Sequence, residues 1–549
     1  MAEKKIGRIS ATEKNPTTCD EFFFWLDDKE KISPFDIVKV ENNINDFKST
    51  TYGIIEDIFY ITDSSGHISN YISSDFGDTE AELLTTKLGL SYARVSVIHN
   101  DKENYMPVKD SCDVYAASEE DIKKALGLDI INEKESIPAG LLKTSNGSVV
   151  PINYSKLFLV GPEGAHLNIS GISGLATKTS YAMFLLQGAQ QKIEDVAIII
   201  LNVKGDDLLK IDKPNSKFEE YQKSDWEKLN LKYKPFENVK FYYPNKKSKT
   251  FPFSNTSLNN KILQEQIEYE KAYNYIYTYE QDKDKLDLLF SNIDDPNFTI
   301  ESILNYISES YDFENLNWDT FKEKLREYSS TETRKQKSNK DISVLSWRKF
   351  SRLISNSIRN DIFQESISGD KNKKQVSLSE EIKKIKSGET FVVDIAKLDE
   401  QLQCLIFGDI IKSVYDMKHG ETEREDIPKK IIIFVDELNK YAPTNSSKSS
   451  PILKYLLEIT ERGRSEGVIL FSAEQFKSAV FDRVKGNCST HIYGRTNAIE
   501  ISKPDYKYIP NVYANMMTRL GKGDLIIQHS IFKTLLKISF PFPSYEQGE

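Results

Sequence analysis

Apolar and polar positions in the first 150 residues follow a pattern of short runs separated by turns. The runs are rich in β-branched and aromatic side chains, and they cover residues 6–9, 21–26, 35–40, 52–61 and 94–98. Asn, Pro, Ser and Gly residues lie between them, which is typical of strands joined by turns. This pattern predicts an N-terminal β-barrel or sandwich over residues 1–150, with one amphipathic helix near residues 119–128.

The hydrophobic pattern changes after residue 150. Apolar runs at 156–160 and 167–170 lead into a glycine-containing loop and a helical segment, and a continuous apolar run follows at 196–203. Strand, loop, helix and buried strand in this order form a βαβ unit of a parallel sheet. Further buried-strand runs are found at 391–394, 431–435 and 468–472. We therefore expect an α/β core made of residues 151–205 and 387–510.

Residues 206–386 interrupt this core, and we expect a helical insertion there. Apolar residues between 300 and 307 recur at a spacing that places them on one face of a helix. The aromatic-rich segment 269–279 predicts a helix in the same way. Residues 321–380 contain 14 Lys and Arg residues against 8 Asp and Glu residues, so this part of the insertion is basic.

Composition narrows the possible classes of protein. The 549 residues contain 73 Lys and Arg against 83 Asp and Glu, a net charge of −10, which excludes a surface uniformly coated with cations. Any contact with nucleic acid must therefore be local. The four cysteines include no CxxC pair, so neither a disulfide framework nor a zinc ribbon is expected. No apolar run approaches the roughly 18 residues of a membrane span, and the start lacks a secretory signal, so we expect a cytoplasmic protein without a membrane partner.

The first motif with chemical meaning is Gly171-Ile-Ser-Gly174-Leu-Ala-Thr-Lys178-Thr179, between a strand and a helix. In a P-loop, backbone N–H groups wrap phosphate oxygens, a Lys reaches the β- and γ-phosphates, and a hydroxyl holds Mg²⁺ at the helix N-terminus. We predict that ATP binds to Gly171, Ser173, Gly174, Leu175, Ala176, Thr177, Lys178, Thr179 and Ser180. The loop is one residue longer than usual, and Thr177 replaces the Gly that normally precedes the Lys. A strand-to-helix turn without a ligand is the alternative.

The second motif is the apolar segment 430–435 followed by Asp436 and Glu437. An acid at the C-terminal end of a buried strand is suited to hold Mg²⁺, and the next acid to polarise the attacking water. We assign Asp436, with Thr179, to the metal and Glu437 to the water. Alone, such a pair more often precedes a solvated turn. A Lys-Thr loop earlier in the same α/β pattern favours one shared site at the carboxyl edge of the sheet.

Three further residues are candidates for catalysis. Gln475 follows the apolar run 468–472 and is placed to sense the γ-phosphate, although a polar strand end explains it equally well. Arg464 and Arg495 are candidates to neutralise charge on the transferred phosphate, in the same subunit or from a neighbouring one. A solvated surface position is the alternative for both arginines.

These motifs resemble the HerA family of bacterial and archaeal ATPases (DUF87-type), in the FtsK-HerA branch of P-loop motors. The opening IGRISATEKNPTT, with EFFFW and PFDIV, is similar to the N-terminal HAS barrel of that family. HLNISGISG is similar to its entry into the Walker A loop, and residues 432–437 are similar to its Walker B strand. GKGDLI and FPFP, within residues 511–549, resemble its closing strands. The resemblance does not cover the insertion.

The resemblance implies a homohexameric ring that couples Mg²⁺-dependent ATP hydrolysis to the movement of double-stranded DNA through a pore. It also implies an effector docked on the ring, a nuclease or a Sir2-like NADase, as in anti-phage defence. Arg348, Lys349 and Arg352 are candidates to line the pore, with a solvated helix face as the alternative. A nucleotide-binding assembly scaffold with weak or no hydrolysis is the alternative function. A motor that moves protein is a third possibility, which the expected lack of a membrane anchor disfavours.

Overall fold

The computed structural model describes residues 4–44, 47–80, 88–172, 177–295, 297–330, 342–420, 424–447 and 450–548. The chain forms two compact units. The first comprises Met1–Asn153, Ile509–Met516 and Ile526–Ser539, and the second comprises Tyr154–Tyr508, Met517–Leu525 and Phe540–Glu549. The C-terminal segment therefore contributes to both units.

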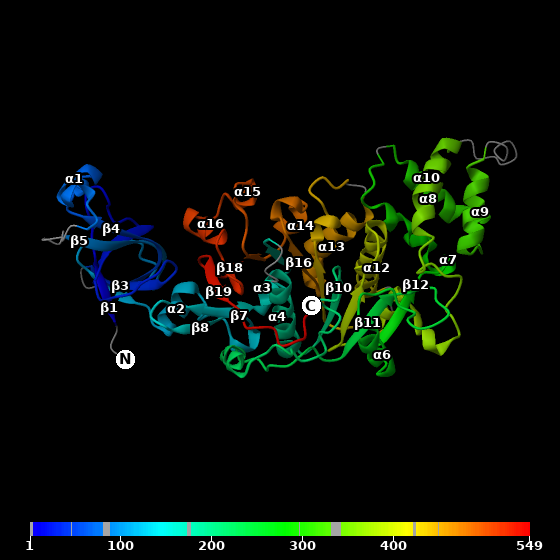
Figure 1. Ribbon diagram of the computed structural model, residues 1–549, viewed down its shortest axis with the longest axis horizontal. Coiled ribbons are helices and arrows are strands. Elements are labelled where there is room, and N and C mark those ends of the chain that lie inside the picture. Colours follow the sequence, from blue (N-terminus) through cyan, green and yellow to red (C-terminus); the bar gives the residue numbers. More distant parts are fainter. Residues whose placement is uncertain are drawn as a thin grey trace. The chain divides into compact units, whose positions relative to one another are not determined.

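The first unit contains a closed antiparallel barrel with the strand order β1-β2-β5-β4-β3-β6 (Figure 1). Its strands are β1 (Lys5–Ile9), β2 (Glu21–Leu26), β3 (Ile37–Ile44), β4 (Phe47–Thr62), β5 (Gly89–Asn100) and β6 (Asp113–Ala116). Phe22 and Phe24 are fully buried and alternate with partly exposed neighbours along β2, as expected for a strand with one face in a core. The predicted barrel is confirmed. Strand β6 was not predicted, because its four residues are too few to show an alternating pattern.

Helix α2 (Glu119–Leu126) confirms the amphipathic helix predicted after the barrel. Ser118 Oγ accepts a hydrogen bond from the Asp121 N–H at 3.2 Å, and the Asp121 carboxylate accepts one from the Ser118 N–H at 3.0 Å. This reciprocal pair satisfies two backbone donors at the start of the helix. The unit also contains four strands in the order β18 (Asp524–His529), β19 (Leu536–Ser539), β7 (Ser136–Lys143) and β8 (Val149–Ser155), and the helices α1 (His67–Ser73) and α16 (Asn511–Met517).

Among the described residues, the second unit carries a parallel sheet of nine strands in the order β13-β12-β11-β14-β10-β15-β16-β9-β17 (Figure 1). The strands are β9 (Leu167–Ser170), β10 (Val196–Asn202), β11 (Val239–Pro244), β12 (Ala272–Ile276), β13 (Gln375–Ser377), β14 (Thr390–Asp394), β15 (Lys430–Asp436), β16 (Val468–Glu474) and β17 (Thr490–Tyr493). β10 and β16 are buried along their whole length, as parallel strands covered on both faces are. The predicted α/β core is therefore confirmed.

Helices precede, connect or follow the strands of this sheet in the chain. They are α3 (Lys156–Leu159), α4 (Thr177–Lys192), α5 (Lys223–Lys228), α6 (Asn260–Glu268), α7 (Tyr279–Asp282), α11 (Leu378–Lys383), α12 (Glu400–Lys418), α13 (Pro451–Glu466), α14 (Asp482–Gly486) and α15 (Ala498–Ile501). α4 packs against β10 and β16, and α13 packs against β16. Within the described part of the chain, no helix is both long enough and apolar enough to cross a bilayer.

Residues 206–386 are not wholly helical, because β11, β12 and β13 extend the parallel sheet from within them. The prediction of a helix over 269–279 is wrong, since Ala272–Ile276 forms β12. Four of its five residues are buried, which removes the alternation of buried and exposed positions that identifies a strand in sequence. Tyr and Asn at its centre are polar enough to break a continuous apolar run.

The rest of the insertion contains the helices α8 (Thr299–Glu309), α9 (Trp318–Tyr328) and α10 (Val344–Ser357). The apolar face predicted near residue 300 is confirmed, because Ile300, Ile303 and Ile307 are all buried. Trp347 on α10 stacks on Phe313 with ring centroids 6.1 Å apart. Aromatic packing of this kind joins the three helices, whose buried side chains are continuous with the hydrophobic core of the sheet.

Candidate functional site

The predicted phosphate loop connects β9 to α4 at the carboxyl edge of the parallel sheet. The Gly171 N–H donates to the Glu474 carbonyl at 3.2 Å, and the Ile172 N–H donates to the Arg495 carbonyl at 2.7 Å, so the loop entrance is fixed to both neighbouring strand ends. A Cβ at Gly171 would lie 3.1 Å from the Arg495 carbonyl oxygen, which explains the glycine. Four predicted binding residues, Ser173, Gly174, Leu175 and Ala176, lie outside the described residues.

Lys178 lies in the first turn of α4 and is only 8 % exposed. Its ammonium group donates a hydrogen bond to the Gly171 carbonyl at 2.6 Å. Burial lowers the pKa of Lys178, while the nearby carboxylates of Asp436, Glu474 and Glu437 act in the opposite direction. The ammonium group is therefore held at the loop by one carbonyl, a contact that a phosphate oxygen is able to replace.

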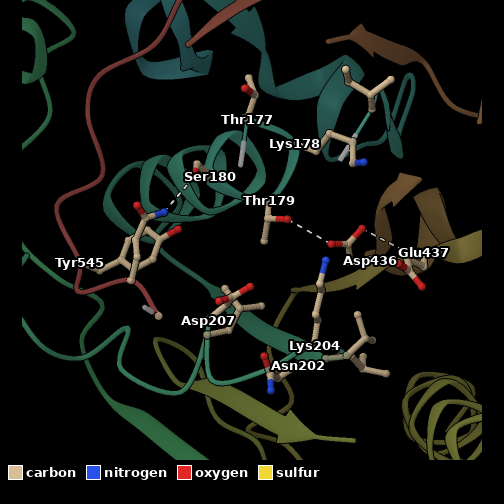
Figure 2. Close-up of a pocket in the computed structure, with 16 residues that line it drawn as sticks. Thr177, Lys178, Thr179, Ser180, Asn202, Lys204, Asp207, Asp436, Glu437 and Tyr545 are labelled. Carbon is tan, nitrogen blue, oxygen red and sulfur yellow. Dashed lines mark hydrogen bonds between the residues drawn. The ribbon is translucent and has the colours of Figure 1, made fainter. Parts of the chain in front are cut away.

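Thr179 and Asp436 meet across the pocket from α4 and β15, although 257 residues separate them in sequence (Figure 2). Thr179 Oγ1 donates to Asp436 Oδ2 at 3.1 Å, and the Glu437 N–H donates to Asp436 Oδ1 at 2.9 Å. Burial raises the pKa of Asp436, and the positive charge of Lys178 opposes that shift. A hydroxyl and a carboxylate oxygen at one point are ligands of the kind that Mg²⁺ takes.

The ligand set at this point fits Mg²⁺ better than a metal held by protein side chains alone. In the described ranges, no three His, Cys, Asp or Glu side chains come close enough to form a metal site of their own. Mg²⁺ in nucleotide sites is bound through one or two carboxylates, with substrate phosphates and waters as the remaining ligands. Thr179 and Asp436 supply the protein part of such a set.

Glu437 adopts the left-handed backbone conformation, with φ 58°, where β15 ends. For a residue with a side chain this conformation is uncommon and is often found at functional sites. Its carboxylate forms an ion pair with Lys440 at 2.5 Å, and the Glu437 side chain borders the same pocket as Asp436. The turn thus presents two adjacent carboxylates to one cavity.

The pocket enclosed by these residues has a volume of about 270 Å³. Its wall also contains residues that the sequence did not indicate: Lys204, Asp207, Tyr545 and Gln547. Lys204 follows β10 and points toward Asp436 in Figure 2. Its position after a buried strand was a usable signal, because carboxyl ends of parallel strands share one edge. Tyr545 and Gln547 come from the C-terminal segment, for which the sequence contained no signal.

Three predicted catalytic residues do not border this pocket. The Arg464 guanidinium donates to the Glu163 carbonyl at 3.1 Å, and Arg495 Nε donates to the Thr518 carbonyl at 3.1 Å. Gln475 lies half-buried just beyond the end of β16. The roles predicted for these three residues stay predictions.

Glu474, the residue before Gln475, is the side chain that β16 places near Lys178. It is fully buried, and neither carboxylate oxygen has a hydrogen-bond partner among the described residues. Burial raises its pKa to about 8, and the neighbouring Asn168 amide and the Lys178 and Lys477 charges counter that effect. The point at which a strand leaves the core is not visible in the sequence, so the neighbouring residue, Gln475, was expected at this position.

The sequence matches no protein-family model and no curated protein. Among solved structures, the bacterial conjugative coupling protein TrwBdeltaN70 is similar, with a TM-score of 0.41 and 10% identity over 70% of this chain and 87% of that one. VirB4 of Thermoanaerobacter pseudethanolicus has a TM-score of 0.42 and 12% identity, over 75% of this chain and 98% of that one. The genome packaging NTPase B204 from Sulfolobus turreted icosahedral virus 2 has a TM-score of 0.23 and 16% identity, over 30% of this chain and 73% of that one. TrwB is also known in complex with ADP and Mg²⁺.

Proposed function

We propose that this chain is a Mg²⁺-dependent ATPase of the HerA type, which forms a homohexameric ring in the cytoplasm and moves double-stranded DNA. The observation that carries the proposal is the convergence of Lys178, Thr179, Asp436 and Glu437 on one pocket at the carboxyl edge of a parallel sheet. Open α/β sheets bind their ligands at this edge. One cation, one hydroxyl and two carboxylates are the groups that phosphoryl transfer requires.

Each side chain has a separate task in the proposed reaction. Thr179 and Asp436, whose side chains are hydrogen-bonded to each other, would hold Mg²⁺, and the ion would supply positive charge that neutralises the phosphates. Lys178 exchanges the Gly171 carbonyl for phosphate oxygens. Glu437 leaves Lys440 and accepts a hydrogen bond from the attacking water, which it orients toward the γ-phosphorus. We further propose that Gln475 senses the γ-phosphate and that Arg464 or Arg495 contacts it from a neighbouring subunit.

One contact supports the alternative of a nucleotide-binding scaffold with little hydrolysis. The Glu437 carboxylate forms an ion pair with Lys440, so the proposed base points to a protein partner. In the scaffold this contact persists when nucleotide binds at Lys178, and the water is never polarised. The two functions therefore differ in turnover and share the binding site.

Phosphate release, measured with and without duplex DNA, distinguishes the two functions. We expect Lys178→Ala to lose nucleotide binding, and Glu437→Gln to keep it while hydrolysis falls at least about 100-fold, the usual contribution of a general base. Lys261→Ala, at an exposed position on α6, is the matched control. DNA-stimulated turnover in the wild type excludes the scaffold, whereas unchanged affinity and hydrolysis in Lys178→Ala contradict the assigned site.

We also propose that a protein effector, a nuclease or a Sir2-like NADase of an anti-phage system, docks on the first unit. Eight large apolar side chains between residues 60 and 90 are more than 40 % exposed: Tyr60, Ile61, Ile68, Tyr71, Ile72, Phe76, Leu88 and Leu90. Residues 57–80 and 88–93 contain several Asp and Glu residues and no Lys or Arg. Exposed apolar surface with an acidic border fits a partner whose apolar contact surface is bordered by cations.

Co-expression of this chain with a candidate nuclease or Sir2-like NADase, sought among the neighbouring genes, tests the docking surface. We expect Ile68→Ser/Tyr71→Ser to abolish co-purification of the effector and to leave phosphate release unchanged. Ile130→Ser, at a position 73 % exposed elsewhere in the unit, is the control and should retain the complex. An effector that binds the double variant as well as the wild type excludes this surface.

A further inference from the structure

A second cavity of about 410 Å³ adjoins the pocket at the phosphate loop, within the second unit. The two cavities share Thr177, Ser180 and Gln547, so they meet at the first turn of α4. The second cavity contains neither Asp436 nor Glu437 in its wall. It therefore lies on the side of the helix N-terminus away from the two carboxylates.

This placement matches the order of groups in a nucleoside triphosphate. The γ-phosphate belongs beside the proposed metal ligand Asp436 and the proposed base Glu437, and the remaining phosphates follow the backbone N–H groups at the start of α4. Ser180 is the residue after Thr179, one step further from the γ-phosphate. The ribose and nucleobase must then leave the helix beyond Ser180, where the second cavity begins.

The wall of the second cavity is suited to a flat aromatic ring. Tyr221, in the short 3₁₀ helix Glu220–Gln222, is 72 % exposed, and Phe542 is half-buried in the C-terminal segment. Both line the cavity together with two prolines of that segment. Nucleobases stack on aromatic side chains of this kind, whichever base is present.

The first pocket offers no such aromatic surface. The Tyr545 ring borders it but is only 1 % exposed. A ring that is packed on all sides has no face for stacking. Of the two cavities, the second, whose wall also contains Asp225 and Lys522, is therefore the one that presents accessible aromatic rings to a base.

The C-terminal wall of the second cavity is fixed before any ligand binds. Trp226 Nε1 donates to the Phe542 carbonyl at 2.9 Å, and Asn215 Nδ2 donates to the Pro543 carbonyl at 2.8 Å. Gln547 Nε2 donates to Ser180 Oγ at 3.0 Å. A wall held in place by these bonds loses little conformational entropy when a ring stacks on it.

We infer that this second cavity binds the nucleobase and ribose of the nucleoside triphosphate, with Tyr221 and Phe542 as the stacking residues. The inference rests on the proposed function, because it requires phosphates at Lys178. Both side chains belong to segments that no phosphate-binding motif includes, so they determine affinity for the nucleoside independently of the phosphate contacts.

Calorimetric titration with MgATP and with magnesium tripolyphosphate tests the inference on the full chain. We expect Tyr221→Ala and Phe542→Ala to weaken ATP binding about tenfold each, the loss typical of one stacking contact, and to leave tripolyphosphate binding unchanged. Tyr221→Phe keeps the ring and should restore wild-type affinity. Tyr269→Ala, at a position 69 % exposed outside both cavities, is the matched control.

The outcomes separate this inference from the proposed function. A wild-type chain that binds neither ligand overturns the proposed function. Wild-type ATP affinity in Tyr221→Ala, or an equal loss for both ligands, overturns the nucleobase site alone. If Phe542→Ala unfolds in a thermal melt, Tyr221→Ala decides the question, because its side chain is largely exposed and its removal leaves no cavity in a core.

Discussion

At the scale of single residues, Glu474 makes the proposed site sensitive to pH. Its carboxyl group is fully buried without a hydrogen-bond partner among the described residues, and burial raises its pKa from 4.5 to about 8. The folded chain therefore keeps a proton that the unfolded chain releases between about pH 4.5 and pH 8. Because the folded state binds more protons in this interval, the free energy of unfolding falls as the pH rises through it.

Glu474→Gln should remove this dependence, since an amide keeps the shape of the group and does not ionise. In Mg²⁺-free buffer, we expect the Tm of the wild type to fall between pH 5.5 and pH 8.5 by at least about 2–4 °C more than that of the variant. Thermal melts followed by circular dichroism measure the difference. Glu227→Gln, at an exposed position, should behave as the wild type does, and an identical slope in Glu474→Gln would refute the assignment.

The proposed site was predictable where its chemistry is local in sequence. Lys178 and Thr179 follow a glycine-containing loop, and Asp436 and Glu437 follow a continuous apolar run, so each pair is recognisable without its partner. Tyr221 and Phe542 were not predictable. Their chemistry is common to every aromatic residue, and only the folding of two distant segments against α4 brings them together.

At the scale of elements, two glycines that end helices provide a matched comparison. Gly467 follows α13 with φ 78°, and Gly420 follows the C-terminal end of α12 with φ 84°. A Cβ at Gly467 would lie 1.9 Å from the Lys429 carbonyl oxygen, whereas a Cβ at Gly420 meets no atom of the described residues within 4 Å. Both substitutions place a side chain in the left-handed region, and only one adds a clash with backbone.

We expect Gly420→Ala to lower the free energy of unfolding by about 1 kcal/mol, the cost of a left-handed residue with a side chain. Gly467→Ala should lower it by at least about 3 kcal/mol, because β15 or β16 must also shift to relieve the overlap. Urea unfolding measures both losses of free energy, provided that the m-value is the same in the variants and the wild type. Equal losses would show that the α13–β16 turn relaxes freely.

The elements show why only part of the fold was predictable. Strands of the barrel alternate buried and exposed side chains, and β10, β15 and β16 are continuous apolar runs, so both patterns are visible in sequence. β12 has neither pattern, because it is buried on both faces and yet contains Tyr and Asn. Tertiary burial decided its conformation, and a single sequence does not record burial.

At the scale of the whole molecule, the net charge of −10 conceals a local basic surface. Arg348, Lys349 and Arg352 are all exposed on α10, on the side opposite the buried Trp347 and Phe350. Arg348 Nε donates to the Ser329 carbonyl at 2.8 Å, while the side chain as a whole is exposed. A symmetric ring repeats such a surface in every subunit, so a local patch suffices to hold DNA.

Replacing all three residues by Ala should weaken duplex DNA binding and reduce the slope of log K against log salt by up to about 3, since each lost phosphate contact removes about 0.9. Fluorescence anisotropy at several salt concentrations measures the slope. Lys102, Lys109 and Lys124 are exposed lysines of the first unit, and their triple Ala variant is the control with the same change in charge. A slope unchanged in the α10 variant identifies this surface as a solvated helix face.

The first unit is made of segments that lie far apart in the chain, and this has a consequence for its folding during synthesis on the ribosome. β19 pairs with β7, and about 390 residues separate the two strands in the chain. At 5–20 residues per second, the ribosome delivers β19 roughly 20 to 80 s after β7. During this interval the barrel strands, all within the first 116 residues, are able to pair, while β7 keeps an open edge. We expect nascent chains that stop before residue 536 to aggregate more readily than the barrel alone.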